Sequence, residues 1–265
     1  MGFGVNPFNY KMKKQMIIAH RGESFIAPEN TLASVLLAWE NGADAVEVDI
    51  RLTLDKKIVV IHDANTKRVS GIRKKVSKTE LSVLKLLDAG SYKGSQYRGE
   101  KIPTLPEILE TVPENGKILI EIKSKKDIIP YLKVVLEESK LKTEQVEIIS
   151  FKLDVLAETK KVMPRFKAHW IVFKSKNLFL RIFSPSWQRI MYKLKKYNLD
   201  GLDLWAGYPL KKEMVNKLKY AGLDVYVWTV NDAGRARELL DIGVNGITTD
   251  RAGWLKEQLK IDSDS

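Results

Sequence analysis

The chain has 265 residues, of which 44% are hydrophobic, enough to bury one large core or two smaller ones. It contains no cysteine, which excludes a disulfide framework, a thiolate metal site and a cysteine nucleophile. Its 45 lysine and arginine residues exceed its 33 aspartate and glutamate residues, and the resulting charge of +12 attracts anions such as phosphate esters, anionic lipid surfaces or nucleic acid.

The opening stretch, MGFGVNPFNYKMKKQM, lacks the apolar centre of a secretory signal peptide. No apolar run elsewhere approaches the length of a membrane span. We therefore expect a cytoplasmic protein.

Short apolar runs alternate with amphipathic stretches along the whole chain, a pattern typical of parallel strands joined by helical crossovers. The amphipathic stretches predict helices over residues 31–41, 128–140, 153–162, 211–221 and 233–242. The apolar runs predict strands over residues 16–19, 45–50, 58–61, 117–122, 146–150, 168–172, 201–205, 224–230 and 246–249.

Nine strands are one more than a (β/α)₈ barrel needs, and one short loop explains the excess. Only residues 55–57 separate two apolar runs, and a parallel neighbour would need a crossover of about a dozen residues. The run 58–61 is therefore predicted to be a hairpin excursion, which leaves eight strands. We predict a single α/β domain over residues 1–265, a TIM (β/α)₈ barrel with a small insertion after strand 2 at approximately 55–103.

In such a barrel the carboxyl ends of the strands form one rim, where the connecting loops carry the chemistry. Two of the three histidines, His20 and His62, fall on this rim, whereas His169 lies near the start of a strand and is expected to be structural. The other polar or aromatic residues at or near predicted strand ends are Arg21, Glu47, Asp49, Glu121, Lys123, Trp228, Asn231 and Asp250.

Three of these rim residues are acidic. Glu47 and Asp49 are two residues apart on one strand, so they point to the same face, and Glu121 joins them from the adjoining strand. Carboxylates directed together repel one another unless protons or a cation neutralise them. Oxygen ligands favour a hard cation, so we predict Mg²⁺ or Ca²⁺ rather than zinc. An E-x-D pair also occurs without metal, and Glu121 with Lys123 could form a simple ion pair.

The rim residues belong to an ordered set of short motifs. The set comprises H-R-G at 20–22, P-E-N-T at 28–31, E-V-D at 47–49, H-D at 62–63, I-P-T-L at 102–105, E-I-K at 121–123, W-T-V-N at 228–231 and T-T-D at 248–250. Each motif alone is weak, but their order and spacing resemble the glycerophosphodiester phosphodiesterase family over residues 16–255. The compact insertion is most similar to that of the small bacterial cytoplasmic members.

The resemblance implies metal-dependent hydrolysis of a small-molecule glycerophosphodiester to glycerol 3-phosphate and an alcohol. It implies that Glu47, Asp49 and Glu121 bind the metal and that His20 and His62 are the catalytic acid–base pair. The residues matched to substrate binding are Arg21, Lys123 and Trp228. No nucleic-acid partner is implied.

The needs of a phosphodiester agree with these roles. Its charge must be neutralised before attack, which a cation, Arg21 and Lys123 can do. Histidine titrates near neutrality, so His20 and His62 each suit the base or the acid, and the sequence leaves that assignment open. The attacking oxygen is either water or the substrate's own glycerol hydroxyl. Gly22 is expected to let the backbone turn close to the ligand.

Residues 174–196 are basic and contain no acid. Ser184 and Pro185 predict the start of a helix. A basic amphipathic helix can lie on an anionic bilayer, which would give peripheral contact at the inner membrane face and a lysophospholipase D activity on lysophospholipids. The alternative is an ordinary barrel helix with its apolar face on the sheet. The residues predicted to share that apolar face are Trp187, Ile190, Met191 and Leu194.

Two other classes fit part of the sequence. The strand-end Lys123 would suit a Schiff-base aldolase. The charge of +12 would suit a non-catalytic anion-binding protein. An aldolase does not account for three clustered acids beside two histidines. An anion-binding protein does not account for the acidic cluster, which would repel a polyanion unless it held a metal.

Overall fold

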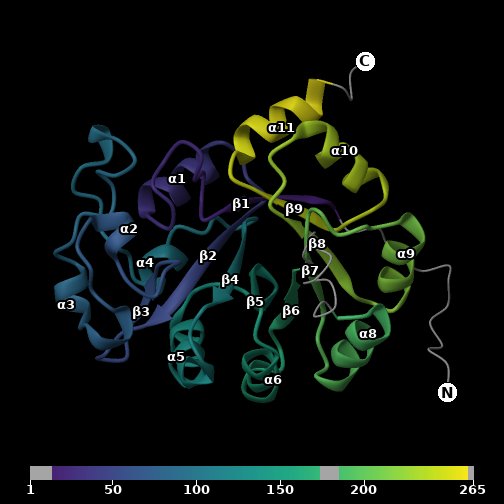
Figure 1. The fold of residues 1–265 in the computed structure, drawn as a ribbon, viewed down its shortest axis with the longest axis horizontal. Helices are drawn as coiled ribbons and strands as arrows, with labels where there is room; N and C mark the ends of the chain where they lie inside the picture. The colour runs from purple at the N-terminus through teal and green to yellow at the C-terminus, as the bar shows by residue number, and fades with distance from the viewer. Residues whose placement is uncertain (1–13, 174–184, 262–265) are drawn as a thin grey trace.

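The computed structural model describes residues 14–173 and 185–261. The barrel strands are β1 (Met16–His20), β2 (Ala45–Leu52), β4 (Lys117–Ile122), β5 (Val146–Ser150), β6 (Lys167–Val172), β7 (Gly201–Trp205), β8 (Asp224–Trp228) and β9 (Gly246–Thr249). Their order is β1-β9-β8-β7-β6-β5-β4-β2, and β2 pairs with β1 to close the ring. All these pairings are parallel, so within the described residues the predicted eight-stranded TIM barrel is confirmed (Figure 1).

The ninth strand, β3 (Ile58–Val60), pairs antiparallel with β2, as the short loop between them requires. β3 and the segment that follows it share a small core of their own, which includes Val59, Leu84 and Ile102. We propose that barrel and insertion form one domain, because β3 extends the barrel sheet. The short helices of the insertion are α2 (Lys67–Ser70), η1 (Val76–Lys78), α3 (Leu81–Leu84), η2 (Ser95–Tyr97) and α4 (Leu105–Leu109).

Helices surround the barrel (Figure 1). All five predicted helices are present, with ends within two residues of those expected from the hydrophobic spacing. The helices outside the insertion are α1 (Leu32–Glu40), η3 (Lys126–Ile128), α5 (Ile129–Glu138), η4 (Thr143–Gln145), α6 (Leu153–Val162), α8 (Trp187–Lys196), α9 (Lys212–Tyr220), α10 (Ala233–Asp241) and α11 (Ala252–Ile261).

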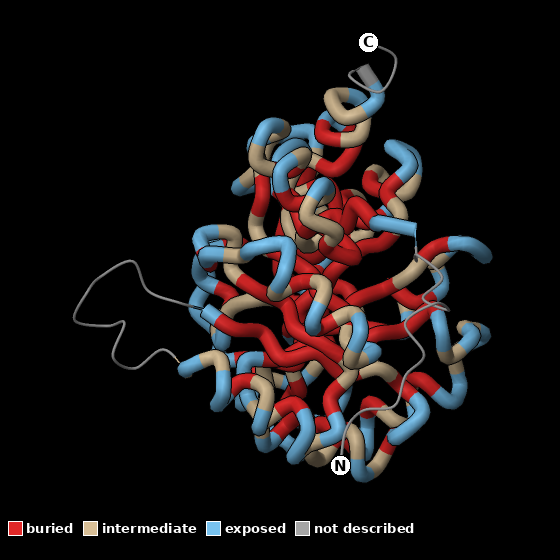
Figure 2. The backbone as a smooth tube through the Cα atoms, turned by 90° about the vertical axis from the view of Figure 1, so that its right-hand side faces the viewer, coloured by how far each residue is buried: buried red, intermediate tan, exposed pale blue. Residues whose placement is uncertain are grey.

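Each barrel strand has two faces that pack against different layers. Val48 and Leu204 belong to the large core between strands and helices. Ile18, Ile171 and Tyr226 belong to a second cluster that fills the barrel. Figure 2 shows the buried residues concentrated in the interior of the molecule and the exposed residues around the outside. Side chains that alternate with the helix-facing row therefore point into the barrel.

The barrel interior also contains His169, which is fully buried near the start of β6. Its Nδ1 lies 3.4 Å from Oε2 of Glu147, and its ring packs edge-on against Tyr226. This position is at the amino-terminal half of the strand, away from the rim, as the structural interpretation of His169 predicts.

Helix α8 begins two residues later than predicted. Its cap is Ser186, whose hydroxyl accepts a hydrogen bond from the backbone N–H of Arg189 at 3.3 Å. Ser184 lies outside the described residues, as does all of 174–184. Ile190 and Leu194 are buried against the barrel, so α8 packs as an ordinary barrel helix. In the described part of the chain, no helix is long and apolar enough to cross a bilayer.

Candidate active site

The three predicted acidic residues meet inside the mouth of the barrel. Glu47 and Asp49 alternate with the helix-facing Val48 on β2, and Glu121 is the register partner of Asp49 on β4. One carboxylate oxygen from each of the three acids lies within 4.8 Å of the others. All three residues are buried. The strand alternation and the parallel register together produce this cluster.

Burial and mutual repulsion shape the protonation of this cluster. Burial raises the pKa of Glu47 well above its usual range, and the charges of Asp49 and Glu121 add to the effect. Burial and the charge of Asp49 raise the pKa of Glu121 to about 7. Burial acts in the same direction on Asp49, but the charges of Arg21 and Lys123 outweigh it and lower its pKa to about 2. Burial and like charge thus disfavour the ionised forms of Glu47 and Glu121, whereas Arg21 and Lys123 favour the ionised form of Asp49.

The cluster fits a hard divalent cation. Oε1 of Glu47 is buried without a hydrogen-bond partner in the described structure. Nζ of Lys123 lies 2.7 Å from Oε1 of Glu121 and 3.1 Å from Oδ1 of Asp49. Its positive charge partly neutralises these two acids. The cluster therefore offers one carboxylate oxygen from each of three acids, and the oxygen of Glu47 has no other partner. Carboxylate oxygens are the ligands that Mg²⁺ and Ca²⁺ prefer.

Asn30, in the loop after β1, holds Asp49 in place. Its Nδ2 donates to Oδ2 of Asp49 at 2.8 Å, and the backbone N–H of Asp49 donates to Oδ1 of Asn30 at 3.1 Å. The φ of Asn30 is +59°, a left-handed conformation that asparagine adopts more readily than most residues. Sequence reasoning assigned Asn30 no role, although the P-E-N-T motif contains it.

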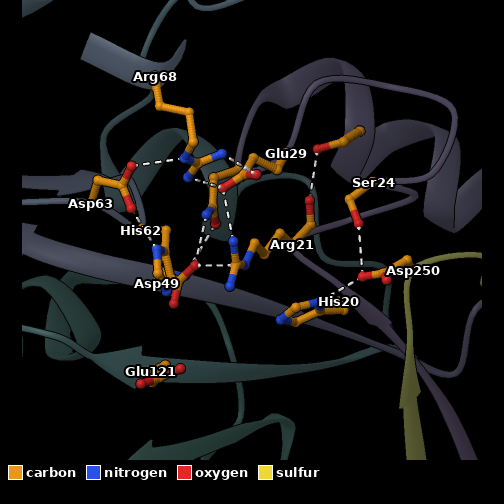
Figure 3. A network of polar contacts seen from close by, with 12 residues as sticks. His20, Arg21, Ser24, Glu29, Asp49, His62, Asp63, Arg68, Glu121 and Asp250 are labelled. Carbon is orange, nitrogen blue, oxygen red and sulfur yellow. Dashed lines mark hydrogen bonds and ion pairs between the residues drawn. The ribbon is translucent and has the colours of Figure 1, made fainter. Parts of the chain in front are cut away.

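His20 ends β1, and a carboxylate fixes its ring (Figure 3). Its Nδ1 lies 2.6 Å from Oδ1 of Asp250, and its Nε2 lies 3.9 Å from Oε2 of Glu47. Asp250 also accepts hydrogen bonds from Asn231 at 2.6 Å and Ser24 at 3.3 Å. Burial would raise the pKa of Asp250, but the hydrogen bond and charge of His20 outweigh it and lower that pKa to about 2. The ring is therefore held with Nε2 towards the acidic cluster.

His62 follows β3 and is held by a longer chain of contacts (Figure 3). Its Nδ1 lies 2.7 Å from Oδ1 of Asp63, and Arg68 of α2 donates to Oδ2 of Asp63 at 2.7 Å. Arg68 also donates to both carboxylate oxygens of Glu29, at 2.7 and 2.8 Å. Glu29 in turn accepts from Arg21 at 2.9 Å. Sequence reasoning missed Arg68 and Glu29, which join two loops far apart in the sequence.

The two predicted phosphate contacts are both paired with acids in this structure. Nε of Arg21 lies 3.1 Å from Oδ2 of Asp49, and Lys123 bridges Asp49 and Glu121. Burial lowers the pKa of Lys123, but the charges of Asp49 and Glu121 outweigh it and raise that pKa. Lys123 is thus a firmly charged ammonium, which disfavours the Schiff-base hypothesis, since imine formation needs a neutral amine.

Gly22 lets the backbone turn after β1, as expected, and it also allows the loop to pack closely against α1. Its φ is +81°, and an added Cβ would lie 2.5 Å from the backbone carbon and Oγ of Ser34 in α1. The loop after β1 therefore packs directly onto α1, and a side chain at this position would separate them.

A cavity of about 130 Å³ at the barrel mouth brings the site together. Of the eight predicted site residues, all but Asp49 line it. Two larger cavities, of about 550 and 450 Å³, lie on the outside of the barrel, and none of the eight predicted site residues lines either of them. The residues that line the central cavity are His20, Arg21, Glu47, His62, Glu121, Lys123, Ile149, Phe151, Ile171, Asp203, Trp228 and Thr248.

Trp228 contributes an aromatic wall to this cavity. Its ring packs edge-on against Phe151 with centroids 5.6 Å apart, and its Nε1 donates to the backbone oxygen of Asp203 at 3.3 Å. Sequence reasoning missed Phe151 and Asp203, and it quoted Thr248 within T-T-D without assigning it a contact. Single aromatic and acidic residues at strand ends carry little signal by themselves.

The barrel and the residues gathered at its mouth are those of a hydrolase that acts on phosphate esters. Residues 20–254 match the glycerophosphoryl diester phosphodiesterase family. The chain belongs to this family, and the resemblance drawn from its motifs is confirmed. It is therefore an enzyme, a phosphoric diester hydrolase.

Individual relatives cover nearly the whole chain. A glycerophosphodiester phosphodiesterase from Caldanaerobacter subterraneus is 32% identical over 244 residues, which span 89% of this chain and 94% of that protein. A lysophospholipase D from Rattus norvegicus is 28% identical over 284 residues, spanning 94% of this chain and 89% of that protein. A solved Oleispira antarctica phosphodiesterase in complex with the product sn-glycerol-3-phosphate has a TM-score of 0.83 and 29% identity, covering 93% of this chain and 97% of that chain.

Proposed function

We propose that this enzyme hydrolyses glycerophosphodiesters to glycerol 3-phosphate and an alcohol, using a divalent cation and two histidines. The observation that supports this most is the convergence on one cavity of a buried acidic cluster and two histidines, each held by a carboxylate. The product named in the Oleispira antarctica structure and the names of the relatives support the same substrate class.

The acids Glu47, Asp49 and Glu121 would hold the cation. Glu47 offers an oxygen that has no other hydrogen-bond partner, and Asn30 fixes the orientation of Asp49. A bound Mg²⁺ or Ca²⁺ neutralises the charge on a phosphodiester and stabilises the charge that develops in the transition state. The other charges available to the phosphate are those of Arg21 and Lys123, with Trp228 forming the wall beside them.

His20 and His62 would move the protons. Because Nδ1 of each ring faces a carboxylate, Nε2 is the nitrogen left for proton exchange with the substrate. One histidine takes the proton of the attacking oxygen, and the other protonates the leaving alkoxide. The attacking oxygen is either water or the substrate's own glycerol hydroxyl. Detection of a cyclic glycerophosphate distinguishes the two, because attack by the hydroxyl forms this product and attack by water does not.

A coupled assay for glycerol 3-phosphate tests this function. The wild-type enzyme should release it from glycerophosphocholine or related diesters, lose activity in EDTA and recover it with Mg²⁺ or Ca²⁺. Glu47→Gln should be inactive, and the exposed Glu137→Gln on α5 should behave as wild type. Activity that survives EDTA, or an active Glu47→Gln, would contradict the proposal.

A lysophospholipase D activity at an anionic membrane surface is a second candidate. The specific observation in its favour is an apolar rim beyond the cavity. Phe173 is 50% exposed, and its ring packs against Trp205 at the carboxyl ends of β6 and β7, with centroids 5.1 Å apart. Such a rim could take an acyl chain. Hydrolysis of lysophosphatidylcholine and liposome binding that falls steeply with salt would support this candidate, and absence of both would end it.

A further inference from the structure

Arg51 lies two residues after Asp49 on β2 and points to the same face of the strand. Its neighbours Ile50 and Leu52 belong to the core between strands and helices. Because side chains alternate along a strand, Arg51 stands in the inner row with Glu47 and Asp49, at the end of β2 that reaches the mouth of the barrel. The residue is half-buried, and it is not among the described residues that line the central cavity.

The guanidinium of Arg51 holds the main chain at His62. Its Nε donates a hydrogen bond to the carbonyl oxygen of His62 at 2.8 Å, and its Nη2 donates to the same oxygen at 2.6 Å. The donors of a guanidinium have a fixed planar arrangement, so two of them on one acceptor fix its direction as well as its distance. Sequence reasoning gave Arg51 no role, since nothing in the local sequence indicates a contact 11 positions away.

This contact begins where the pairing of the strands ends. β3 ends at Val60, and the N–H of Ile61 donates to the carbonyl oxygen of Asp49 at 2.8 Å. Among the described residues, that is the last main-chain hydrogen bond from this segment to β2. His62 follows immediately, so its main chain is held to the barrel strand by a side chain, that of Arg51.

The contacts at the ring of His62 do not replace this link. Asp63 orients the ring, but it is the next residue in the chain, so a shift of the loop carries both residues together. Arg68 joins Asp63 to Glu29, which lies in the loop after β1 and not on a barrel strand. Arg51 is thus the side chain that fixes this loop relative to β2, the strand that carries two of the three clustered acids.

We propose that Arg51 is a positioning residue for His62, which sets the place of its ring relative to the acids of β2. The inference rests on the proposed function and adds a residue that acts through the histidine. Proton transfer requires the two groups within hydrogen-bond reach, and a displacement of about 1 Å can cost about a hundredfold in rate. Loss of Arg51 should therefore lower kcat and leave KM nearly unchanged, because Arg51 does not line the cavity.

Substitution of Arg51 gives the first test. Arg51→Met removes both donors and keeps the apolar stem, and kcat for glycerophosphocholine should fall about 10- to 100-fold, with KM within about twofold of wild type. Arg51→Lys keeps the charge and one donor and should recover part of the loss. Arg165→Met, exposed before β6 at the opposite end of the barrel, is the control. A kcat of Arg51→Met equal to that of wild type would refute the proposal.

A double-mutant cycle separates positioning from a direct effect of charge. Three acids act electrostatically on Arg51, namely Asp49, Asp63 and Glu121, so its removal also changes the field at the site. If Arg51 acts through His62, Arg51→Met should cost less than about twofold in kcat once His62 is already alanine. A loss as large in the His62→Ala background as in wild type would show that Arg51 acts independently of the histidine, and the proposal would be wrong.

Histidine NMR gives a readout that needs no activity. The chain has three histidines, so the ring resonances can be assigned with His20→Ala and His62→Ala. In Arg51→Met the His62 resonance should broaden as the ring samples several positions, whereas that of the fully buried His169 should stay as in wild type. A His62 resonance that stays sharp and unmoved contradicts the proposal.

Two outcomes are kept apart by this design. If wild type hydrolyses no glycerophosphodiester but the His62 resonance still broadens in Arg51→Met, the proposed function fails and the placement of the ring by Arg51 holds. If circular dichroism shows that Arg51→Met does not fold, Arg51→Lys carries the same three comparisons, with smaller losses expected. Wild-type kcat in Arg51→Lys together with a sharp, unmoved His62 resonance would then overturn the proposal.

Discussion

Oδ1 of Asp250 lies 2.6 Å from Nδ1 of His20, and this contact joins the last barrel strand to the first. The closure of the barrel thus also orients a candidate catalytic ring. A carboxylate at Nδ1 fixes the tautomer and directs Nε2 into the cavity. The same arrangement recurs at His62 with Asp63, on a hairpin outside the ring of eight.

We expect His20→Ala to reduce turnover by about 10²–10⁴ while the protein stays folded, since general acid–base catalysis contributes on that scale. Steady-state rates of glycerophosphodiester hydrolysis, together with circular dichroism, check this. His169→Asn is not a suitable control because His169 is buried, so the exposed Tyr192→Phe serves instead. Turnover of His20→Ala close to wild type would remove His20 from the mechanism.

Asp250→Asn should lower stability in a pH-dependent way. The pKa of Asp250 is lowered from 3.8 to about 2, so its stabilising effect is present above pH 3.8 and is lost as pH falls towards 2. The shift corresponds to at most about 2 kcal/mol, and less in practice because the side chain is 30% exposed. Urea unfolding between pH 6 and pH 3 should show the difference between wild type and variant shrinking with acidity. A difference that stays constant would contradict this account.

Arg68→Ala should lower kcat although Arg68 lines no part of the cavity. Its guanidinium holds Asp63, which holds His62, so its loss frees the ring and changes the proton affinity of His62. We expect a drop of about tenfold or more, with a shift in the pH profile of kcat/KM that a purely structural change would not produce. Arg73→Ala, exposed in the same insertion, is the control. An unchanged pH profile would refute a positioning role.

Much of the fold follows from local patterns. The alternation of apolar runs and amphipathic stretches predicts the barrel, and the three-residue loop at 55–57 predicts the hairpin of β3. The E-x-D spacing places Glu47 and Asp49 on one inner face, because the period of a strand is two. These predictions succeed because each depends on residues close together in the sequence.

The missed contacts depend on residues that only the folded chain brings together. Arg68 and Glu29 lie 39 positions apart, and nothing in either local sequence indicates their bidentate contact. Asp203 stands in an apolar strand, where one acid between two leucines gives no periodic signal. Ser34 leaves no room for a side chain at position 22, and this contact depends on how the loop packs against α1. A rule about turns, which considers only neighbouring residues, cannot reveal it.

The central claim is that Glu47, Asp49 and Glu121 bind one divalent cation together. Isothermal titration calorimetry of the metal-free protein with Mg²⁺ and Ca²⁺ tests this claim most directly. The variants are Glu47→Gln and Glu121→Gln, with Glu137→Gln as the matched control. We predict one site in wild type and in the control, with binding lost in the other two variants. Wild type that binds neither ion, or cluster variants that bind as wild type does, would contradict the account.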